Sequence, residues 1–596
     1  MENKELFEEL NTLEKELSSL PIGYISKKTI RGKKKCYHQW MENGKKKSKY
    51  VDDATADMLQ KQFSRRKELQ NQIKQIKATV KVDNSSKSRK NVKYNTKIYT
   101  GELLRGNFTD ITGFKCRELL PRIEEYIYGT IIPKVFILYG LRRTGKTTMM
   151  KQVISRMDDN DFGKTAFIQV KSGDELSKLY DDMDTLRSEG YKYVFIDEVT
   201  LLEDFIEGAS LFSDIYAASG MKIVLSGTDS LGFVFSKSDQ LYDRCIMLHT
   251  TYIPYKEFEN VLGKKGIDEY IRYGGTMSLG GIHYNEEKPF EDKNSSDQYI
   301  DSAISNNIQH SLKYYQDGNH FRALEELYEK KELTGAINRI IEDMNHKFTI
   351  EVLTRDFVSH DLGISKRNLR IDRDHPSDIL NQVDKDQVTE KLMELLEIKN
   401  KKDQTVDITE THCEEIKEYL ELLDLTVDVD IRLMPPESER IKRTIFTQPG
   451  MRYSQATGLI QSLMEDAAFD VLSATEKTRV VNRILDEIKG RMMEDIVLLE
   501  TKLAYPGKRV FKLEFAVGEF DMVVSDPVAL ESEIYEIKYS KEALKEQAKN
   551  LLDENKCSAT EYSYGKTAKK VVLYRGEDTS IDGIQYQNVE EYLKNL

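Results

Sequence analysis

The chain has 596 residues, which is too long for one domain and suggests three or four. Its net charge of -12 excludes a protein that coats nucleic acid with its whole surface, so any basic face must be local. Five scattered cysteines without a C-x-x-C pair argue against a disulfide framework or a cysteine zinc site. Because the sequence has no long apolar run, we predict a cytoplasmic protein that does not contact a membrane.

Residues 1–80 are expected to form a helical module around a basic hairpin. One apolar stripe begins the segment and another ends it, each with the three- and four-residue spacing of an amphipathic helix. Two such stripes favour an antiparallel helix pair or an oligomeric coiled coil. The first stripe comprises Leu6, Leu10, Leu13, Leu17 and Leu20, and the second comprises Leu69, Ile73, Ile76 and Val80.

Between the stripes, residues 27–51 predict a β-hairpin with turns at Arg31-Gly32 and Glu42-Asn43-Gly44. Ten lysines and arginines lie between Lys27 and Lys49 against a single acid, Glu42, with aromatic residues interleaved. Because a two-stranded ribbon fits the major groove and lysines pair with phosphates, DNA is the predicted partner. The composition resembles the β-ribbon arms of some mobile-element and phage integrases. A solvated basic ribbon, or a docking site for the acidic remainder of the chain, is the alternative.

Residues 81–98 are polar and unpatterned and are expected to be a linker, and residues 99–265 are expected to form an ATPase domain. An apolar segment at 135–139 predicts a buried parallel strand, which is followed by G-x-x-x-x-G-K-[ST] and a helix. In such a loop backbone N–H groups and the lysine bind phosphates, and the hydroxyl binds Mg²⁺. The alternative is a flexible basic loop. The predicted ATP-binding residues are Gly140, Thr144, Gly145, Lys146, Thr147 and Thr148.

Another apolar strand, at 193–196, ends in two carboxylates. In a P-loop ATPase, Asp197 would hold Mg²⁺ through water and Glu198 would polarise the attacking water. The strand at 222–225 ends in small polar residues, of which Ser226 or Thr228 could sense the γ-phosphate. An ordinary turn at the end of a strand is the alternative.

Arg244 precedes one more apolar strand. It could act as an arginine finger, either in the same chain or from a neighbouring subunit of a homo-oligomer. A surface ion pair with Asp243 or Asp239 is the alternative.

Several segments within residues 100–280 together resemble one family. They are GLRRTGKTT, YVFIDEV, KIVLSGTDS, LYDRCIMLHTTYIPYKEF and DEYIRYGGT. They are similar to the prokaryotic AAA-type ATPases whose C-terminal part is a PD-(D/E)xK nuclease-like domain of unknown function. The family often has a glutamine or a similar polar residue after the acidic pair, where this chain has Val199-Thr200. The resemblance implies nucleotide and Mg²⁺ residues at Gly145, Lys146, Thr147, Asp197 and Glu198, a sensor at Ser226 or Thr228, and the motif arginine at Arg244.

Residues 266–480 are expected to be mainly helical, with a strand-like alternating segment at 422–432. A winged-helix module that contacts DNA fits this pattern. A helical spacer fits it equally well.

Residues 481–596 are expected to form an α/β nuclease-like domain. A long amphipathic helix at 478–502 carries Glu494, and strand-like segments follow it. Because side chains alternate along a strand, Glu536 and Lys538 share one face, and Asp521 can point to that face from the neighbouring strand. Two carboxylates and a lysine can bind Mg²⁺ and support hydrolysis of a phosphodiester.

Gln547, in a helix predicted to follow the last strand, and Glu494 complete a set that resembles the PD-(D/E)xK pattern. The predicted catalytic residues are therefore Asp521, Glu536, Lys538 and Gln547, and the predicted metal ligands are Asp521, Glu536 and Glu494. The same fold also serves as a binder that does not cut, so both outcomes are open for this domain.

The predicted fold class is α/β: a P-loop parallel sheet flanked by helices, a helical middle and a C-terminal α/β nuclease-like domain. The predicted function is an ATP-hydrolysing AAA-type ATPase that uses ATP and Mg²⁺ and is coupled to a DNA-interacting C-terminal domain. The alternative is a signalling-type ATPase switch that acts through protein partners without cutting DNA. A helicase-like motor is disfavoured because no second P-loop core is evident.

Overall fold

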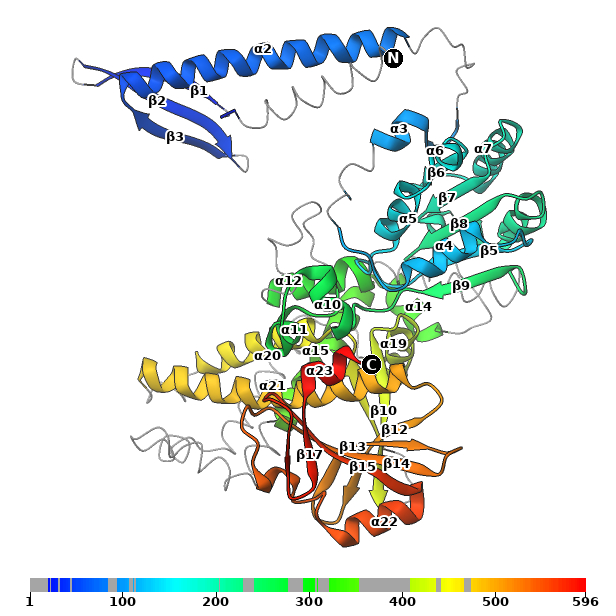
Figure 1. Cartoon of the computed structure of the whole chain (residues 1–596), viewed down its shortest axis with the longest axis vertical. Coiled ribbons are helices and arrows are strands. Elements are labelled where there is room, and N and C mark those ends of the chain that lie inside the picture. The colour runs from blue at the N-terminus through cyan, green and yellow to red at the C-terminus, as the bar shows by residue number, and fades with distance from the viewer. Residues whose placement is uncertain are drawn as a thin grey trace. The chain divides into compact units, whose positions relative to one another are not determined.

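A computed structural model of the chain (Figure 1) describes residues 20–21, 23–30, 33–42, 45–83, 94–106, 111, 114–202, 204–228, 241–276, 293–305, 308, 321–352, 408–435, 441–465 and 473–596. The chain divides into two compact units, residues 1–93 and 94–596. The predicted leucine helix before residue 20 and most of the predicted linker lie outside the described residues. In the part of the chain that is described, no helix is both long enough and apolar enough to cross a bilayer.

The first unit contains a three-stranded antiparallel sheet with the order β1-β2-β3. Its strands are Tyr24–Ile30, Lys33–Glu42 and Lys45–Val51, and residues 31–32 and 43–44 of the two predicted turns lie outside the described residues. Helix α2, Asp53–Asp83, packs on the sheet, where the ring of Phe63 lies 5.4 Å from that of His38. Leu69, from the second predicted stripe, is fully buried.

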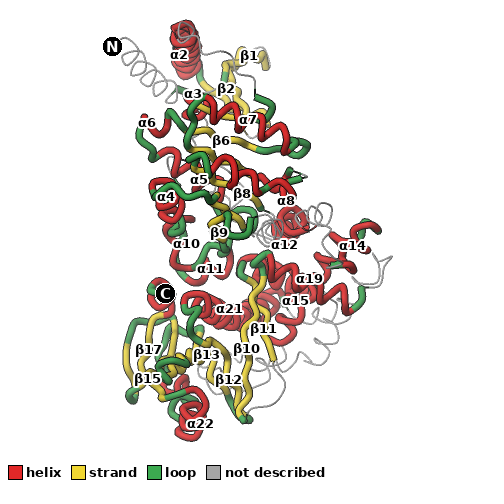
Figure 2. The backbone as a smooth tube through the Cα atoms, turned by 90° about the vertical axis from the view of Figure 1, so that its right-hand side faces the viewer, coloured by secondary structure: helices red, strands yellow, loops and turns green. Residues whose placement is uncertain are grey.

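The second unit begins with a six-stranded sheet, in the order β4-β6-β7-β8-β5-β9. The last five strands in this order are parallel, and β4 is antiparallel to β6. These parallel strands are apolar along their length because helices cover both faces of the sheet (Figure 2). The strands are β4 (Lys97–Thr100), β5 (Val135–Tyr139), β6 (Thr165–Gln169), β7 (Tyr193–Asp197), β8 (Lys222–Gly227) and β9 (Cys245–His249).

Two groups of helices enclose this sheet. Helices α4 (Leu120–Tyr128) and α5 (Lys146–Ser155) supply apolar side chains to the core on one face. Helix α7 (Leu176–Ser188) and the π-helical segment η4 (Phe212–Ala217) cover the other face. The short helices α3 (Gly101–Gly106), α6 (Asp159–Phe162) and α8 (Phe205–Gly208) and the 3-10 turn η3 (Val199–Leu201) complete this part. The predicted parallel sheet flanked by helices is thus confirmed.

Helices follow the sheet and form a separate buried core around Tyr299, Ile304 and Tyr419. The predicted winged helix falls partly on residues 353–407, which lie outside the described residues. The described elements of the middle region are α10 (Tyr255–Leu262), α11 (Ile267–Tyr273), α12 (Lys293–Tyr299), η6 (Ile300–Ser305), α14 (Arg322–Glu329), α15 (Leu333–Glu351), α19 (Glu410–Leu422) and α20 (Pro449–Met464).

The chain ends in a mixed eight-stranded sheet, in the order β11-β10-β12-β13-β14-β15-β17-β16. Its first two strands, β10 (Thr426–Met434) and β11 (Ile441–Phe446), come from the predicted middle region. They join this sheet because β10 pairs in parallel with β12. The other strands are β12 (Arg509–Phe515), β13 (Glu519–Asp526), β14 (Glu531–Lys538), β15 (Lys566–Tyr574), β16 (Thr579–Ile581) and β17 (Ile584–Asn588).

Helix α21, Ala474–Ala504, packs on one face of this sheet, and the predicted domain boundary at residue 481 falls inside it. Helix α23, Val589–Lys594, packs beside α21, and α22, Glu554–Tyr564, covers the other face. The order of elements from α21 is one helix, three antiparallel strands, a helix and a parallel strand.

Candidate functional site

The phosphate-binding loop joins the end of β5 to the start of α5. Gly140 has a φ of 138°, and a Cβ atom there would lie 2.3 Å from the carbonyl oxygen of Thr250. Gly145, with a φ of 94°, precedes the first residue of α5. Both positions have a left-handed conformation that side chains rarely adopt, which explains the glycines of the motif. The N-terminus of α5 therefore opens into the loop, where backbone N–H groups can bind an anion.

Lys146 is buried, and its Nζ donates hydrogen bonds of 2.7 Å to the carbonyl oxygens of Gly140 and Leu141. Burial lowers the pKa of this lysine to about 8, although Glu198 and Asp197 oppose the shift. The hydroxyl of Thr144 also donates to the Leu141 carbonyl, at 2.9 Å. The loop is thus closed on itself around the lysine ammonium group. Thr148 is half-buried in the first turn of α5.

Asp197 ends β7 beside the loop and is buried. The hydroxyl of Thr147 donates to its carboxylate at 2.9 Å, and the hydroxyl of Ser226, at the end of β8, donates to it as well. Burial and the neighbouring charge of Glu198 raise the pKa of Asp197. Two hydroxyls and a carboxylate whose charge burial disfavours fit Mg²⁺, which prefers oxygen ligands.

Glu198 follows Asp197 in a left-handed conformation, with a φ of 58°. Its carboxylate accepts a 3.2 Å hydrogen bond from the hydroxyl of Thr228. The strand order brings these groups together, because β8 lies between β5 and β7 and all three strands end at one edge of the sheet.

Arg244 lies elsewhere, at the start of β9. Its carbonyl oxygen accepts a hydrogen bond from the N–H of Val135, which begins β5, whereas the phosphate-binding loop follows the end of β5. A five-residue strand separates the two ends by about 16 Å, so Arg244 cannot reach a phosphate bound by its own chain. Arg244 Nε contacts Asp214 at 2.8 Å, whereas Asp243 contacts Lys134. The other predicted partner, Asp239, lies outside the described residues.

Two of the predicted residues in the C-terminal sheet converge on a third, Lys538 of β14. Its Nζ lies 3.0 Å from Asp521 Oδ2 of β13 and 2.7 Å from Glu536 Oε2. Both carboxylates are buried, and the N–H of Ile537 donates to Asp521 at 2.7 Å. Burial raises the pKa of Glu536 to about 8, whereas the charges of Lys538 and Lys512 outweigh burial and lower the pKa of Asp521.

Glu494 of α21 lies near this cluster and forms a 2.6 Å ion pair with Arg491. Burial raises the pKa of Glu494, and the charge of Asp521 adds to the shift. Within the described ranges, no three His, Cys, Asp or Glu side chains are arranged to hold a metal ion. Instead, the ammonium group of Lys538 lies between Asp521 and Glu536.

Gln547 does not join the cluster. It lies in a 3-10 turn, η9 (Lys545–Ala548), where its side chain accepts from the N–H of Leu544 and donates to the carbonyl of Glu542, both at 3.1 Å. The amide that does contact the cluster is Asn550, which donates to Glu536 Oε1 at 2.9 Å. Our prediction of a helix here overlooked Asn550, although it lies only three residues after Gln547.

A family described as AAA domain matches residues 133–259, which hold the phosphate-binding loop, the acidic pair, Ser226 and Thr228. Residues 133–259 are an AAA domain. This AAA domain implies ATP binding, which in such domains typically depends on Mg²⁺. A second family, a domain of unknown function (DUF6788), matches residues 3–61, which include the basic sheet. No curated protein matches the chain.

Solved structures also resemble the chain, weakly. One is a closed-state reconstruction of Hsp104 with ATPγS and FITC casein, with 13% identity, a TM-score of 0.22 and coverage of 28% of this chain and 31% of that chain. A second is the ORC1 protein of Aeropyrum pernix in complex with DNA, with 12% identity, a TM-score of 0.21 and coverage of 59% of this chain and 91% of that chain. A third is the S. cerevisiae Hsp104-ADP complex, with 11% identity, a TM-score of 0.23 and coverage of 77% of this chain and 65% of that chain. The chain spans less than a third of the first structure, and TM-scores this low carry no inference about function.

The AAA domain also depends on residues that the sequence analysis did not identify. Arg117, which precedes the matched segment, is buried and donates to the carbonyl of Thr144 in the loop at 2.8 Å. The guanidinium group of Arg143 lies 5.2 Å from the ring centre of Tyr299, which belongs to the helical core that follows. No local motif marks these contacts, because each partner is more than twenty residues away in the sequence.

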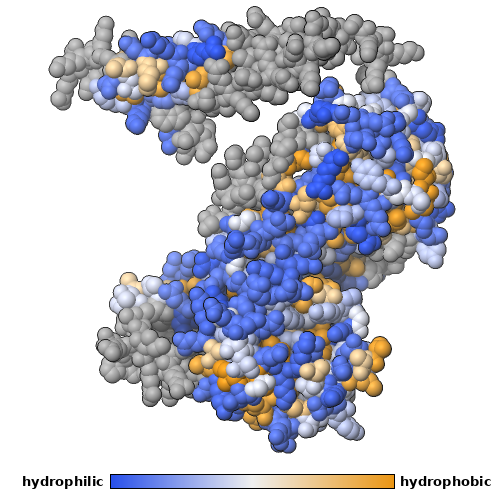
Figure 3. All heavy atoms as spheres, viewed as in Figure 1, coloured by the Kyte–Doolittle hydropathy of each residue, from blue (hydrophilic) through white to orange (hydrophobic). Residues whose placement is uncertain are grey.

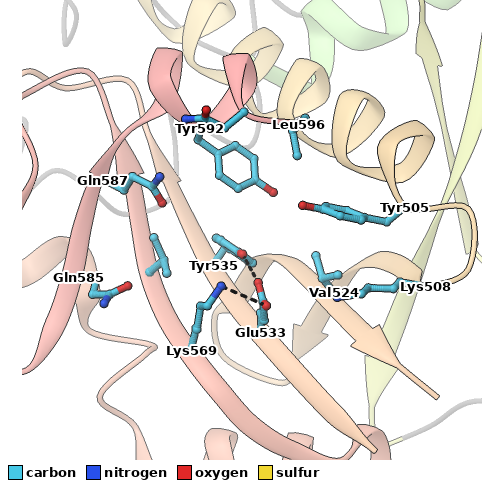
Figure 4. Close-up of a pocket in the computed structure, with 12 residues that line it drawn as sticks. Tyr505, Lys508, Val524, Glu533, Tyr535, Lys569, Gln585, Gln587, Tyr592 and Leu596 are labelled. Atoms are coloured by element: carbon cyan, nitrogen blue, oxygen red, sulfur yellow. Dashed lines mark hydrogen bonds and ion pairs between the residues drawn. The ribbon is translucent and has the colours of Figure 1, made fainter. Parts of the chain in front are cut away.

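A small pocket of about 200 Å³ lies on the C-terminal sheet. Figure 4 shows Tyr505, Tyr535 and Tyr592 around it, with Lys569 paired to Glu533. Because side chains alternate along β14, Glu533 and Tyr535 face away from Glu536 and Lys538. The pocket is therefore separate from the carboxylate cluster.

Proposed function

We propose that this protein is an ATP-hydrolysing AAA ATPase whose nucleotide state governs a nuclease-like site in its C-terminal sheet, with DNA as the ligand. In the AAA domain, Lys146 and the backbone of the loop bind the phosphates, and Thr147 and Asp197 hold Mg²⁺. Glu198 orients and polarises the attacking water. Thr228 contacts Glu198 and Ser226 contacts Asp197, so both hydroxyls can respond to the γ-phosphate.

The observation that carries the nuclease-like assignment is the position of Lys538, whose Nζ contacts both Asp521 and Glu536. The order of the elements, from α21 through β12, β13, β14 and α22 to β15, also fits the PD-(D/E)xK pattern. Asp521 and Glu536 are the oxygen donors that would hold Mg²⁺, which would activate water for attack on a phosphodiester. Lys538 would neutralise the charge of the phosphate, and Asn550 would hold Glu536 in place.

The basic sheet of the first unit supports DNA as the ligand. Among its described side chains, Lys47, Lys49 and Tyr50 are exposed, and the ring of Tyr50 packs against that of Tyr37 at 5.8 Å. Lysines on an exposed sheet bind phosphates in a way that weakens with salt. Arg244 lies far from the loop of its own chain and is only partly buried, so it suits a contact with a neighbouring subunit of a homo-oligomer.

The test measures ATP hydrolysis with and without duplex DNA, and Mg²⁺-dependent nicking of a supercoiled plasmid. Lys146→Ala should abolish hydrolysis, and Asp521→Asn should abolish nicking. Asp526→Asn, on the same strand but half-buried and outside the cluster, serves as the matched control and should nick as the wild type does. Nicking that survives in Asp521→Asn would reject the nuclease assignment, and hydrolysis that survives in Lys146→Ala would reject the nucleotide site.

A second function is favoured by the charge balance of the cluster. Asp521 and Glu536 are already paired with Lys538, and Glu494 is paired with Arg491. A site neutralised in this way suits a switch that acts through a protein partner and does not cut. That function predicts ATP hydrolysis without nicking, and no steep loss of DNA affinity between two salt concentrations in a gel-shift experiment.

A further inference from the structure

A series of buried polar contacts begins at the phosphate-binding loop. The carbonyl of Thr144 accepts a 2.8 Å hydrogen bond from Arg117, which also forms a two-pronged ion pair with Glu257 of α10, at 2.7 and 3.2 Å. The same guanidinium group donates to the carbonyl of Tyr252 at 3.2 Å. Because Arg117 and Glu257 are both buried, this contact holds the loop to the short segment 252–257.

Glu500 of α21 binds that same segment from the other side. Its Oε1 accepts hydrogen bonds from the N–H of Tyr255, at 2.9 Å, and from the hydroxyl of Tyr270, at 3.0 Å. The hydroxyl of Tyr252 lies near this carboxylate, because Glu500 contributes, after burial, to the raised pKa of Tyr252. Tyr252 therefore contacts Arg117 with its backbone, and its side chain lies near Glu500.

Helix α21 also reaches the carboxylate cluster. Glu494, which lies near Asp521 and Lys538, precedes Glu500 by six residues, a rise of about 9 Å along the helix. Between them, Asp495 is held by Arg452 at 2.9 Å and by Arg443 at 2.5 Å. Figures 1 and 2 both draw α21 between α11 and the C-terminal sheet, and α21 contacts both. The same helix thus contacts Tyr255 and Tyr270 through Glu500, and lies near the carboxylate cluster through Glu494.

We propose that Arg117 is a positioning residue for the phosphate-binding loop, and that Tyr252 and Glu500 transmit the position of the loop to α21 and so to Glu494. The inference rests on the proposed function for its two end points, ATP at the loop and chemistry at the cluster. A shift of the Thr144 carbonyl on nucleotide binding moves Arg117 and the segment 252–257. Because Glu500 accepts its hydrogen bonds from Tyr255 and Tyr270, which adjoin this segment, that shift changes the environment of α21.

The experiment uses the full chain and MgATPγS. Nucleotide binding is titrated first, and hydrogen exchange of the α21 amides between residues 490 and 504 is then compared with and without saturating nucleotide. Wild-type protein should show a nucleotide-dependent change in α21, which Glu500→Gln and Tyr252→Phe should lose. Arg117→Lys should weaken ATPγS binding about tenfold, because a lysine cannot hold Glu257 together with the carbonyls of Thr144 and Tyr252.

Glu487→Gln is the matched control, because it makes the same chemical change on the same helix in a surface pair with Arg483. It should keep the wild-type response. Tyr252→Phe removes only a hydroxyl, so it tests whether the α21 response depends on this contact even if Glu500→Gln does not fold. An α21 response that persists in both variants, or that is missing in wild-type protein with bound ATPγS, overturns the inference alone. Wild-type protein that does not bind ATPγS overturns the proposed ATPase function instead.

Discussion

The hydroxyl of Thr228 donates a hydrogen bond to the carboxylate of Glu198 across 3.2 Å, between the ends of two neighbouring strands. Glu198 holds this position in a left-handed conformation that is uncommon for any residue other than glycine. Strained residues of this kind are retained where the surrounding structure requires them, often at sites of chemistry. We therefore expect substitutions of Glu198 and of Thr228 to lower the rate of ATP hydrolysis by different amounts.

Glu198→Gln should lower the rate of ATP hydrolysis by at least about 100-fold while ATP still binds, because the amide cannot act as a base. Thr228→Val should lower kcat by about tenfold, as expected for a lost hydrogen bond to a charged group. Steady-state ATPase kinetics measure both effects. Thr185→Val, which changes a hydroxyl on α7 that bonds only to its own helix, is the control. Unchanged kcat in Glu198→Gln would remove it from the catalytic role.

Gly140→Ala should abolish ATP binding. The added methyl group would lie 2.3 Å from the Thr250 carbonyl oxygen, and alanine rarely adopts a φ of 138°. Gly335→Ala is the control, because nothing lies within 4 Å of its added methyl group inside α15. That substitution should raise the free energy of unfolding by about 0.5–1 kcal/mol. Fluorescent-nucleotide titration and chemical denaturation measure the two effects, and wild-type affinity in Gly140→Ala would contradict the geometry of the loop.

Arg452→Leu should lower the free energy of unfolding by about 3 kcal/mol, because it leaves a buried carboxylate with one partner fewer. Arg452 contacts Asp495 at 2.9 Å with both side chains almost fully buried. Arg483→Leu removes a more exposed pair with Glu487 on the same helix and should cost less than about 1 kcal/mol. Denaturant titrations of the two variants give the comparison, and equal losses would show that burial of the Asp495 pair does not matter.

Stability should fall between pH 4.5 and pH 7 because of Glu500. Burial raises the pKa of its carboxyl group from 4.5 to about 7, among Tyr252, Tyr255, Tyr270 and Lys256. Below pH 4.5 the group is protonated whether the chain is folded or unfolded. As the pH rises to about 7, only the unfolded chain loses the proton readily, which costs the folded state about 3 kcal/mol.

Glu500→Gln stays neutral and should remove this loss. The measurement is the free energy of unfolding across that pH range for wild type and variant, and the difference between the two curves isolates Glu500 from other buried acids. Parallel curves would contradict the raised pKa.

The double variant Lys47→Ala and Lys49→Ala should weaken DNA binding and reduce the slope of log affinity against log salt by about two, one for each lost phosphate contact. Both lysines are exposed on β3. Lys178→Ala, a surface lysine of α7 paired with Glu175, should leave the slope unchanged. Equal slopes for the double variant and the wild type would exclude this face from DNA binding.

The sequence predicted which residues lie together beside the phosphate-binding loop, because their placement follows from local patterns. The residues of the loop are consecutive, and Asp197 and Ser226 each end a strand, so a parallel sheet brings them to one edge. Arg244 shows the limit of that reasoning. Arg244 also adjoins an apolar strand, β9, but it precedes the first residue of that strand. Because β9 runs parallel to β5, the start of β9 lies at the edge of the sheet opposite the loop.

In the C-terminal part, alternation along β14 correctly put Glu536 and Lys538 on one face. Asp521 points to the same face from the neighbouring strand β13. Gln547 lies in a 3-10 turn where a longer helix was predicted, and its amide bonds to Leu544 and Glu542. The strands β10 and β11 were assigned to the middle region, since nothing in their own sequence indicates that β12, some eighty residues later, is their neighbour.

By itself, the sequence determined the local chemistry: the loop that accepts phosphate, the acidic end of β7 and the alternation that pairs Glu536 with Lys538. Spacing within a strand, turn or helix suffices for these, because backbone geometry repeats over a few residues. Only the tertiary structure decided that Arg117 holds Thr144 and that Glu500 meets Tyr252. Those contacts join residues far apart in the chain, and the packing of α10 and α21 creates them.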